Sequence, residues 1–277
     1  MTSIVSSAIQ ARYYKMNRTN IAWTNYTWNP ITGCTAVSSG CKNCYAKAVH
    51  ERFYDTPFSE IVFHEDRLDA PRKKKKGKMI FVGSMTDLFH DNVSFEWLYK
   101  IWVVMMMSPQ HTFQILTKRP DRMKEFLDNY APVPAMTGAS YKDCVPHNIW
   151  LGTTIENQKE ISRARILINI PAAVHFISVE PMVGEVDFSE YYLQDKRGHH
   201  PFPYLSESAK TKIIEMLDWV IVGGESGAKS KVREMKPEWV QKIYDDCKTN
   251  SVPFFFKQWG AHKPSGSYDF ENIQQFP

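Results

Sequence analysis

Residues 79–87 read MIFVGSMTD, and this stretch contains the pattern that decides the fold. Four apolar residues are followed by a glycine and then by Ser84, Thr86 and Asp87. A short apolar run, a turn with polar residues and a helix-like stretch then follow one another repeatedly, and the starts of the six runs are separated by 33, 36, 26, 45 and 34 residues. Such spacing is typical of strand–helix units, and runs that are apolar on both faces are typical of parallel strands covered by helices. The predicted strands are 79–83, 112–117, 148–153, 174–179, 219–223 and 253–257.

Helical patterns fill the gaps between these strands. The predicted helices are 95–107, 121–129, 157–168 and 234–248. We therefore predict an α/β fold: a (β/α) barrel with parallel strands, of a partial or modified TIM type, built as one domain over residues 1–277. Two stretches interrupted by proline, near 131–146 and 185–204, are expected to be surface insertions.

The composition is that of a soluble globular chain. Its 277 residues are 43% hydrophobic and carry a formal charge of +4, which excludes disordered and fibrous classes. No apolar run approaches the roughly 18 residues of a membrane span, and residues 1–16 lack the apolar segment of a secretion signal. We therefore expect a cytoplasmic protein with no membrane partner. The Lys73 to Lys76 run is either a solvated loop or a contact for nucleic-acid phosphates.

Polar groups follow every predicted strand. In parallel α/β folds the functional site lies at the carboxyl ends of the strands. We therefore expect the strand-end residues to form one site, although a solvated charge remains the alternative for any single residue. The charged residues concerned are Asp87, Lys118, Arg119, Glu156, Glu180, Glu225 and Lys257.

Three of the five cysteines lie close together in the segment 28–46. Cys34, Cys41 and Cys44 have the spacing C-x6-C-x2-C, and clustered thiols of this kind favour a zinc or iron–sulfur centre. The set is one ligand short of the usual four. A cubane cluster could keep one iron open, or His50 could complete a Cys3His zinc site.

Short motifs across residues 21–260 carry a resemblance to a known family. They are Trp28-Asn29-Pro30, the three cysteines with Tyr45-Ala46, Ser84-Met85-Thr86-Asp87-Leu88-Phe89, Leu116-Thr117-Lys118-Arg119-Pro120, Leu151-Gly152-Thr153-Thr154-Ile155-Glu156, Ser178-Val179-Glu180-Pro181 and Gly223-Gly224-Glu225-Ser226-Gly227. With these motifs the chain resembles the bacteriophage Gp37/Gp68 proteins, also called the DUF5131 or three-Cys-motif family, which is related to radical S-adenosylmethionine (SAM) enzymes.

The resemblance implies a [4Fe-4S] cluster on Cys34, Cys41 and Cys44, with SAM bound to the fourth iron. SAM is then cleaved to a radical that abstracts hydrogen from the substrate. The common radical SAM spacing is C-x3-C-x2-C, so this chain departs from it in the first gap. The aromatic residue also follows the last cysteine, as Tyr45, instead of preceding it.

The resemblance also implies roles for the strand-end residues. Ser84 and Asp87 would bind the SAM amino group, and Glu156 would bind the ribose. Further SAM contacts would come from the same mouth, namely Glu180, Gly223, Gly224 and Ser226. Catalytic or substrate-binding roles would fall to Glu225, Lys118 and Lys257.

Neither the substrate nor the oligomeric state follows from the sequence. A small molecule, a nucleotide or a nucleic acid is the expected substrate class, and radical chemistry implies an electron-donor protein. Two alternatives remain open: a zinc-stabilised nucleic-acid-binding protein, and a non-catalytic barrel that acts as a sensor or partner-binding module.

Overall fold

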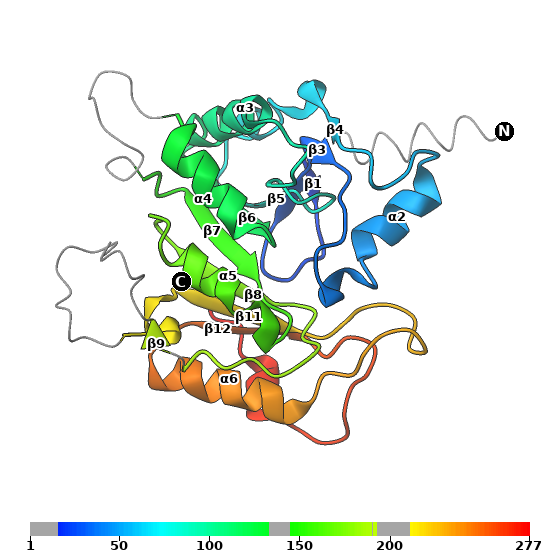
Figure 1. The fold of residues 1–277 in the computed structure, drawn as a ribbon, viewed down its shortest axis with the longest axis vertical. Coiled ribbons are helices and arrows are strands. Elements are labelled where there is room, and N and C mark those ends of the chain that lie inside the picture. The colour runs from blue at the N-terminus through cyan, green and yellow to red at the C-terminus, as the bar shows by residue number, and fades with distance from the viewer. Residues whose placement is uncertain (1–15, 133–144, 190, 193–210) are drawn as a thin grey trace.

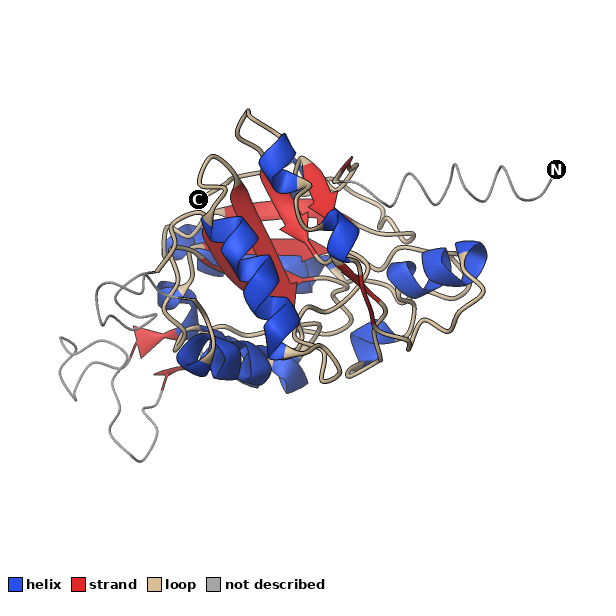
Figure 2. Ribbon diagram, turned by 90° about the horizontal axis from the view of Figure 1, so that it is seen from above, coloured by secondary structure: helices blue, strands red, loops and turns tan. Residues whose placement is uncertain are grey.

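An eight-stranded sheet curls into a half-barrel at the centre of the structure (Figures 1 and 2). The structure, a computed structural model, describes residues 16–132, 145–189, 191–192 and 211–277. The strand order is β1-β2-β5-β6-β7-β8-β11-β12, and every neighbouring pair is parallel except β1 with β2. This confirms the predicted partial barrel of the TIM type. Its strands are β1 (Asn17–Arg18), β2 (Tyr26–Trp28), β5 (Met79–Val82), β6 (Thr112–Thr117), β7 (Ile149–Thr154), β8 (His175–Val179), β11 (Trp219–Gly223) and β12 (Phe254–Gln258).

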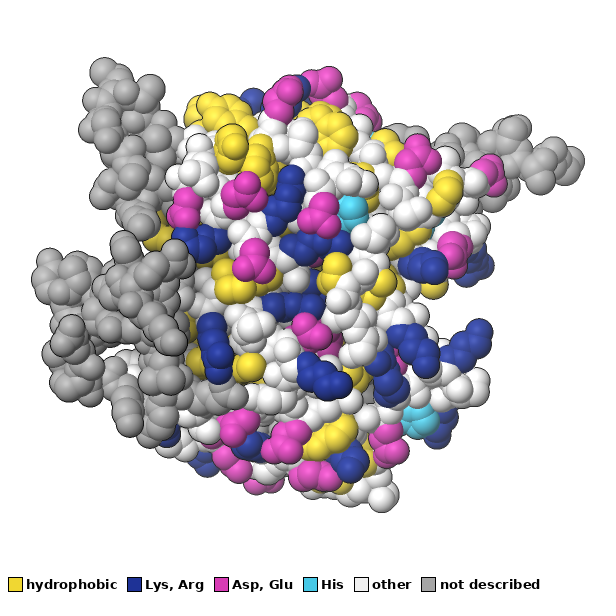
Figure 3. Space-filling model, in the orientation of Figure 1, with side chains coloured by type: hydrophobic (Ala, Val, Ile, Leu, Met, Phe, Trp, Pro, Cys, Tyr) yellow, Lys and Arg dark blue, Asp and Glu magenta, His cyan; other side chains and the backbone are white. Residues whose placement is uncertain are grey.

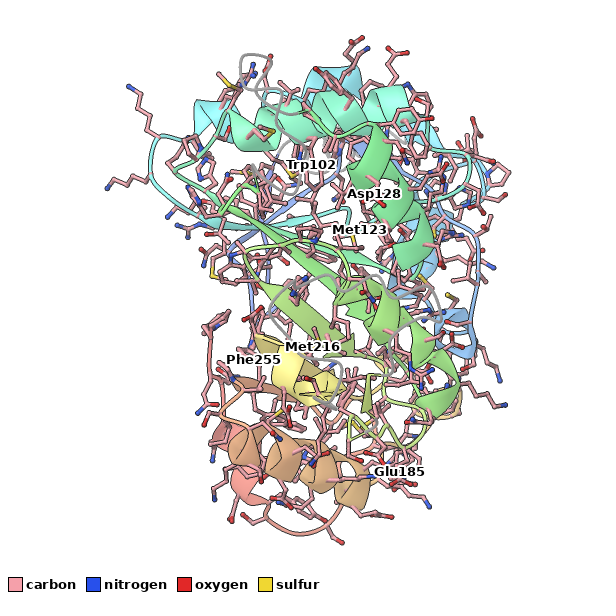
Figure 4. All side chains as sticks on the ribbon, turned by 60° about the vertical axis from the view of Figure 1, so that its left-hand side comes forward. Trp102, Met123, Asp128, Glu185, Met216 and Phe255 are labelled. Carbon is pink, nitrogen blue, oxygen red and sulfur yellow. The ribbon has the colours of Figure 1, made fainter. Side chains whose placement is uncertain are left out.

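Helices cover the outer face of the sheet. They are α3 (Phe95–Met106), α4 (Pro120–Asn129), α5 (Ser162–Leu167) and α6 (Pro237–Thr249), whereas α2 (Tyr45–Phe53) stands beside the barrel (Figure 1). The side chain of Ser94 caps α3 by accepting a hydrogen bond from the Trp97 amide at 3.2 Å, and α4 and α6 both begin with proline. Trp102 of α3 and Met123 of α4 are fully buried on the sheet side of their helices (Figure 4).

Every predicted strand and helix has an observed counterpart, but α2 and the two-residue strands were not predicted, and one predicted helix differs. β2 was missed, since three residues are too short for a pattern. The predicted helix 157–168 is a 3-10 turn, η5 (Gln158–Glu160), followed by α5. Residues 133–144 and 193–210, which make up most of the two predicted insertions, lie outside the described residues.

Small two-stranded sheets pair β3 (Ile31–Thr32) with β4 (Val62–Phe63) and β9 (Tyr191–Tyr192) with β10 (Thr211–Lys212). No helix of the described part is long and apolar enough to cross a bilayer.

The two faces of the strands bury different sets of side chains. On β8, Ile177 and Val179 pack in the main core beneath the helices, whereas Phe176 points inside the half-barrel. The same alternation places Trp219 of β11 beside Phe176 and Phe255 of β12 beside Trp219. The interior of the half-barrel is therefore an aromatic core of its own.

The C-terminal segment runs along the outer edge of β12. The amide of Phe256 donates to the carbonyl oxygen of Ile273 at 2.8 Å, and that of Gln275 donates to the carbonyl oxygen of Phe254 at 3.0 Å. A bridge joins Phe255 and Gln274 in antiparallel orientation. The last strand of the half-barrel is thus paired on both sides.

Candidate functional site

A pocket of about 350 Å³ lies at the carboxyl ends of the strands, the end at which the sequence placed the site. Its walls come from the cysteine segment, from the loops after β5, β6, β8 and β11, and from the ends of β7 and β12. Of the predicted site residues, those that line it are Cys34, Cys41, Cys44, Ser84, Asp87, Lys118, Arg119, Glu180, Gly224, Glu225, Ser226 and Lys257. The predicted site residues Glu156 and Gly223 are not among the lining residues.

The layering of the barrel interior gives the pocket an apolar floor and polar walls. Trp23, Phe81 and Leu116 form part of the floor, above the aromatic core. Two residues after Phe176 and Phe255, on the same inward face of β8 and β12, lie Ser178 and Lys257, and both line the pocket. The pocket is therefore suited to an organic ligand whose apolar part faces inward and whose polar part faces the mouth.

Local backbone geometry brings the three cysteines to this pocket. Gly33 adopts φ 97°, and a Cβ there would lie 2.0 Å from the carbonyl oxygen of Glu60, so only glycine fits before Cys34. Cys41 ends the 3-10 turn η1 (Ser39–Cys41), and Cys44 is the N-cap of α2. All three thiols are partly exposed and line the same cavity.

The three thiols share one cavity, so the possible metal groups can be compared with their surroundings. Three thiolates on one zinc ion lie about 4 Å apart, because Zn–S bonds are about 2.3 Å long. Within the described residues, no three His, Cys, Asp or Glu side chains are placed to hold a single ion. His50 does not line the pocket, and its Nε2 donates to the carbonyl oxygen of Thr56 at 2.8 Å. His50 is therefore not placed beside the three thiols in this structure, and the thiols that line the cavity are Cys34, Cys41 and Cys44.

Asp87 fastens the loop after β5 to the end of β6. Its Oδ1 accepts hydrogen bonds from Thr117 Oγ1 at 2.6 Å and from the Phe89 amide at 3.0 Å. Its Oδ2 accepts from the Lys118 amide at 3.0 Å and from Arg119 Nη1 at 3.2 Å. The carboxylate is thus already saturated with donors, so its geometry indicates a positioning role rather than the predicted contact with a SAM amino group.

Arg119 extends this connection to the cysteine segment. Its Nη1 lies 4.0 Å from Cys34 Sγ, and its Nη2 donates to the carbonyl oxygen of Thr35 at 3.3 Å. Burial, reinforced by the charge of Asp87, raises the pKa of the Cys34 thiol to about 11 despite Arg119. The metal-free thiol is therefore protonated at neutral pH, and binding as a thiolate would release a proton.

His90 holds the same segment from a second direction. Its Nδ1 accepts from the Asn92 amide at 3.1 Å, so the proton lies on Nε2, which donates to Thr35 Oγ1 at 2.8 Å. Burial, together with the charge of Arg119, lowers the pKa of His90 and keeps the ring neutral. The residue is a structural support for the segment.

Glu156 lies beneath the cysteine segment and is completely buried. Its Oε1 accepts from Ser38 Oγ at 2.5 Å and pairs with Lys118 Nζ at 3.1 Å, while its Oε2 accepts from Arg163 Nη1 at 2.9 Å. Burial alone would raise its pKa, but Lys118, the Ser38 hydroxyl and Arg163 together lower it. Gly40 packs so closely that a Cβ there would lie 2.4 Å from Glu156 Cγ. Glu156 therefore supports the segment from below, and the ribose contact that the resemblance implied has no support in this geometry.

Glu225 clamps the segment through Arg233. The carboxylate accepts from the Arg233 amide at 2.8 Å and from its Nε at 3.0 Å, and Arg233 Nη1 donates to the carbonyl oxygen of Ser39 at 2.9 Å. Burial tends to raise the pKa of Glu225, but the hydrogen bonds from Arg233 outweigh it and lower the pKa. Asn43 Nδ2 also donates to the carbonyl oxygen of Lys231 at 3.1 Å. The loop after β11 is thereby attached to the cysteine segment at two points.

Glu180 and Lys257 form the charged pair that faces the pocket. They are hydrogen-bonded to each other, and their side chains are 18% and 21% exposed. Lys118 is similarly exposed but is paired with the buried Glu156. All three predicted catalytic residues, Glu225, Lys118 and Lys257, therefore lie at the pocket in ion pairs.

Sequence reasoning missed Ser38, Arg163 and Arg233, which hold the cysteine segment together. A hydrogen bond between Ser38 and Glu156 joins residues 118 positions apart, so no local motif reveals it. A second, polar cavity of about 710 Å³ adjoins the pocket and shares Ile21, Tyr45 and Ser84 with it. Tyr45 Oη donates to the carbonyl oxygen of Ser84 at 2.6 Å, which joins α2 to the β5 loop between the two cavities.

Comparison with known proteins agrees with this architecture. The sequence profile of a family described as "Protein of unknown function (DUF5131)" matches residues 18–274. No curated protein matches the sequence. Among solved structures, the chain is similar to a point mutant of spore photoproduct lyase, with 12% identity and a TM-score of 0.53. It is also similar to another mutant of that lyase with a dinucleoside spore photoproduct, with 11% identity and a TM-score of 0.54. Each match covers 89% of this chain and 79% of the other, and both show that the chain shares the fold of this lyase.

Proposed function

The chain belongs to the DUF5131 family, and from the geometry of its site we propose that it is a radical SAM-type enzyme that acts on a nucleotide or nucleic-acid substrate. The observation that carries the proposal is the position of Cys34, Cys41 and Cys44 around one pocket at the mouth of a half-barrel. The dinucleoside in the structure of spore photoproduct lyase supports the substrate class. The association with bacteriophages stays a prediction.

In this proposal the three cysteines hold a [4Fe-4S] cluster and the pocket holds SAM. When bound, and with an electron delivered to the cluster by an external one-electron donor, these cofactors would supply a radical that removes hydrogen from the substrate. The chain would contribute orientation and exclusion of water. Asp87, Glu156 and Glu225 fix the cysteine segment from three sides through their hydrogen bonds.

The remaining polar groups of the pocket would orient the two organic ligands. Glu180 and Lys257 offer one negative and one positive group side by side, a combination that suits polar substituents of SAM or substrate. Gly224 and Ser226 place backbone next to them, without large side chains in the way. The apolar floor keeps water away from the reacting atoms.

Metal analysis of anaerobically reconstituted protein tests the proposal. We expect about four irons and four sulfides per chain, lost in Cys34→Ala, Cys41→Ala and Cys44→Ala. Cys247→Ala is the matched control, because Cys247 is buried in the main core away from the pocket. Cys144 lies outside the described residues. Reduced protein should then cleave SAM. Stoichiometric zinc without iron, or iron loading that survives all three substitutions, would contradict the proposal.

A further inference from the structure

Three lysines without ion-pair partners lie on the loops at the mouth of the pocket. Lys42 follows Cys41, and Lys229 and Lys231 lie on the loop after β11. The hydrogen bond from Asn43 Nδ2 to the carbonyl oxygen of Lys231 holds these two loops against each other. All three lysines are exposed, and among the described side chains none has an acidic group within ion-pair distance of them.

Other cations at this site differ from these three lysines because they form ion pairs. Lys118, Lys257 and Arg233 each have a carboxylate partner, so their charges are compensated within the protein. Lys42, Lys229 and Lys231 therefore leave an uncompensated positive rim beside the pocket. Figure 3 shows Lys and Arg side chains gathered on the side of the molecule where α2 and the loop after β11 project.

We propose that this rim binds the phosphates of a nucleic-acid strand, and that one unpaired base of the strand enters the pocket. The inference rests on the proposed function and specifies its substrate as a strand rather than a free nucleoside. Phosphates spaced along a backbone are the ligands that several separate lysines recognise together. A base that is single-stranded or flipped out can reach the apolar floor, whereas a paired base cannot.

A second basic run provides an internal control. The run of Lys73 to Lys76 precedes β5, and the carbonyl oxygen of Lys74 accepts from Gln110 Nε2 just before β6. Both contacts place the run at the amino ends of the strands, whereas the pocket lies at their carboxyl ends. The side chains of Lys73, Lys75 and Lys76 are exposed like those of the rim. The two triads therefore carry the same charge at opposite ends of the half-barrel.

Fluorescence anisotropy with labelled 12-residue single strands of DNA and of RNA tests the proposal over a range of salt concentrations. The rim variant, Lys42→Ala with Lys229→Ala and Lys231→Ala, should reduce the slope of log K against log salt by about 2, because each phosphate contact contributes about 0.7. Over the tenfold range from 1 M to 0.1 M salt, a slope difference of about 2 corresponds to roughly hundredfold weaker binding by the rim variant at 0.1 M. The control variant, Lys73→Ala with Lys75→Ala and Lys76→Ala, should leave slope and affinity unchanged.

Whichever of the two strands, DNA or RNA, binds with the higher affinity identifies the backbone of the substrate. Three results would overturn the proposal. They are equal losses of affinity in the rim and control variants, no loss of affinity in the rim variant, and competition by polyglutamate as strong as that by an unlabelled strand of the same charge. Binding is measured without SAM, so it does not depend on the cluster. Iron loading of the rim variant should equal that of the unmodified protein, which distinguishes failure of this inference from failure of the proposed function.

Discussion

Replacement of Glu156 by glutamine tests how the cysteine segment is held. The side chain is fully buried and balances Lys118 and Arg163, and loss of one member of a buried ion pair costs about 3–5 kcal/mol. For Glu156→Gln we expect a cost at the lower end of this range, about 3 kcal/mol. Arg163 still has a carboxylate partner in Glu160 at 2.8 Å, and Lys118 is 20% exposed and can be solvated. Thermal unfolding followed by circular dichroism should show a decrease of roughly 6–12 °C.

Glu160→Gln is the matched control for this substitution. It removes a carboxylate from the same Arg163, but its side chain is 24% exposed, so we expect a cost below about 1 kcal/mol. Iron loading should decrease only in Glu156→Gln, because Glu156 alone of the two bonds to Ser38 of the cysteine segment. Equal stabilities of the two variants would refute the proposed support.

The pH dependence of the same variant gives an independent check. The pKa of Glu156 is lowered in the folded protein, so its stabilisation is complete above the unfolded pKa of about 4.3. The stabilisation is lost as the pH falls through the folded pKa. The difference in unfolding free energy between the unmodified protein and Glu156→Gln should therefore be constant near neutral pH and shrink below about pH 4. A difference that persists at low pH would show that charge is not its source.

Three further substitutions act on the same segment. Gly40→Ala should cost about 1–3 kcal/mol in denaturant unfolding, because its Cβ would meet Glu156; an unchanged midpoint would mean that the segment can shift. Arg233→Ala leaves Glu225, which is 3% exposed, without its main donor; it should cost about 3–5 kcal/mol near neutral pH, and this cost should shrink as the pH falls and Glu225 is protonated. Asp87→Ala should reduce iron loading and stability together. Weaker SAM binding with unchanged iron loading would instead support a direct contact between Asp87 and SAM.

Much of the fold could be predicted from the sequence because its signals are local. Six strands and three helices follow from apolar runs and their boundaries, and Pro237 sets the start of α6. β2 could not be predicted, because its three residues become a strand only by pairing with β5. Tertiary pairing, rather than propensity, decides such a short element.

The position of the candidate site could be predicted, but not the roles of its members. Strand order places Asp87, Glu156 and Glu225 near the mouth, as the topology requires. Whether such a carboxylate faces the ligand or supports a loop depends on its partners, which for Glu156 and Asp87 include Ser38 and Arg119 from distant segments. Those contacts are set by packing, and one sequence does not reveal them.

A barrel that does not close has two edges, and the pairing of residues 273–275 along β12 determines how one of them is covered. Unpaired strand edges are templates for joining a second molecule. At one end of the sheet β1 is only two residues long, which offers little to pair with. At the other end the C-terminal segment occupies the hydrogen-bonding positions of β12, and Trp219 Nε1 secures it by donating to the carbonyl oxygen of Gln275 at 2.8 Å. This segment therefore blocks edge-to-edge pairing with a second molecule, and its deletion would leave the five-residue edge of β12 unpaired.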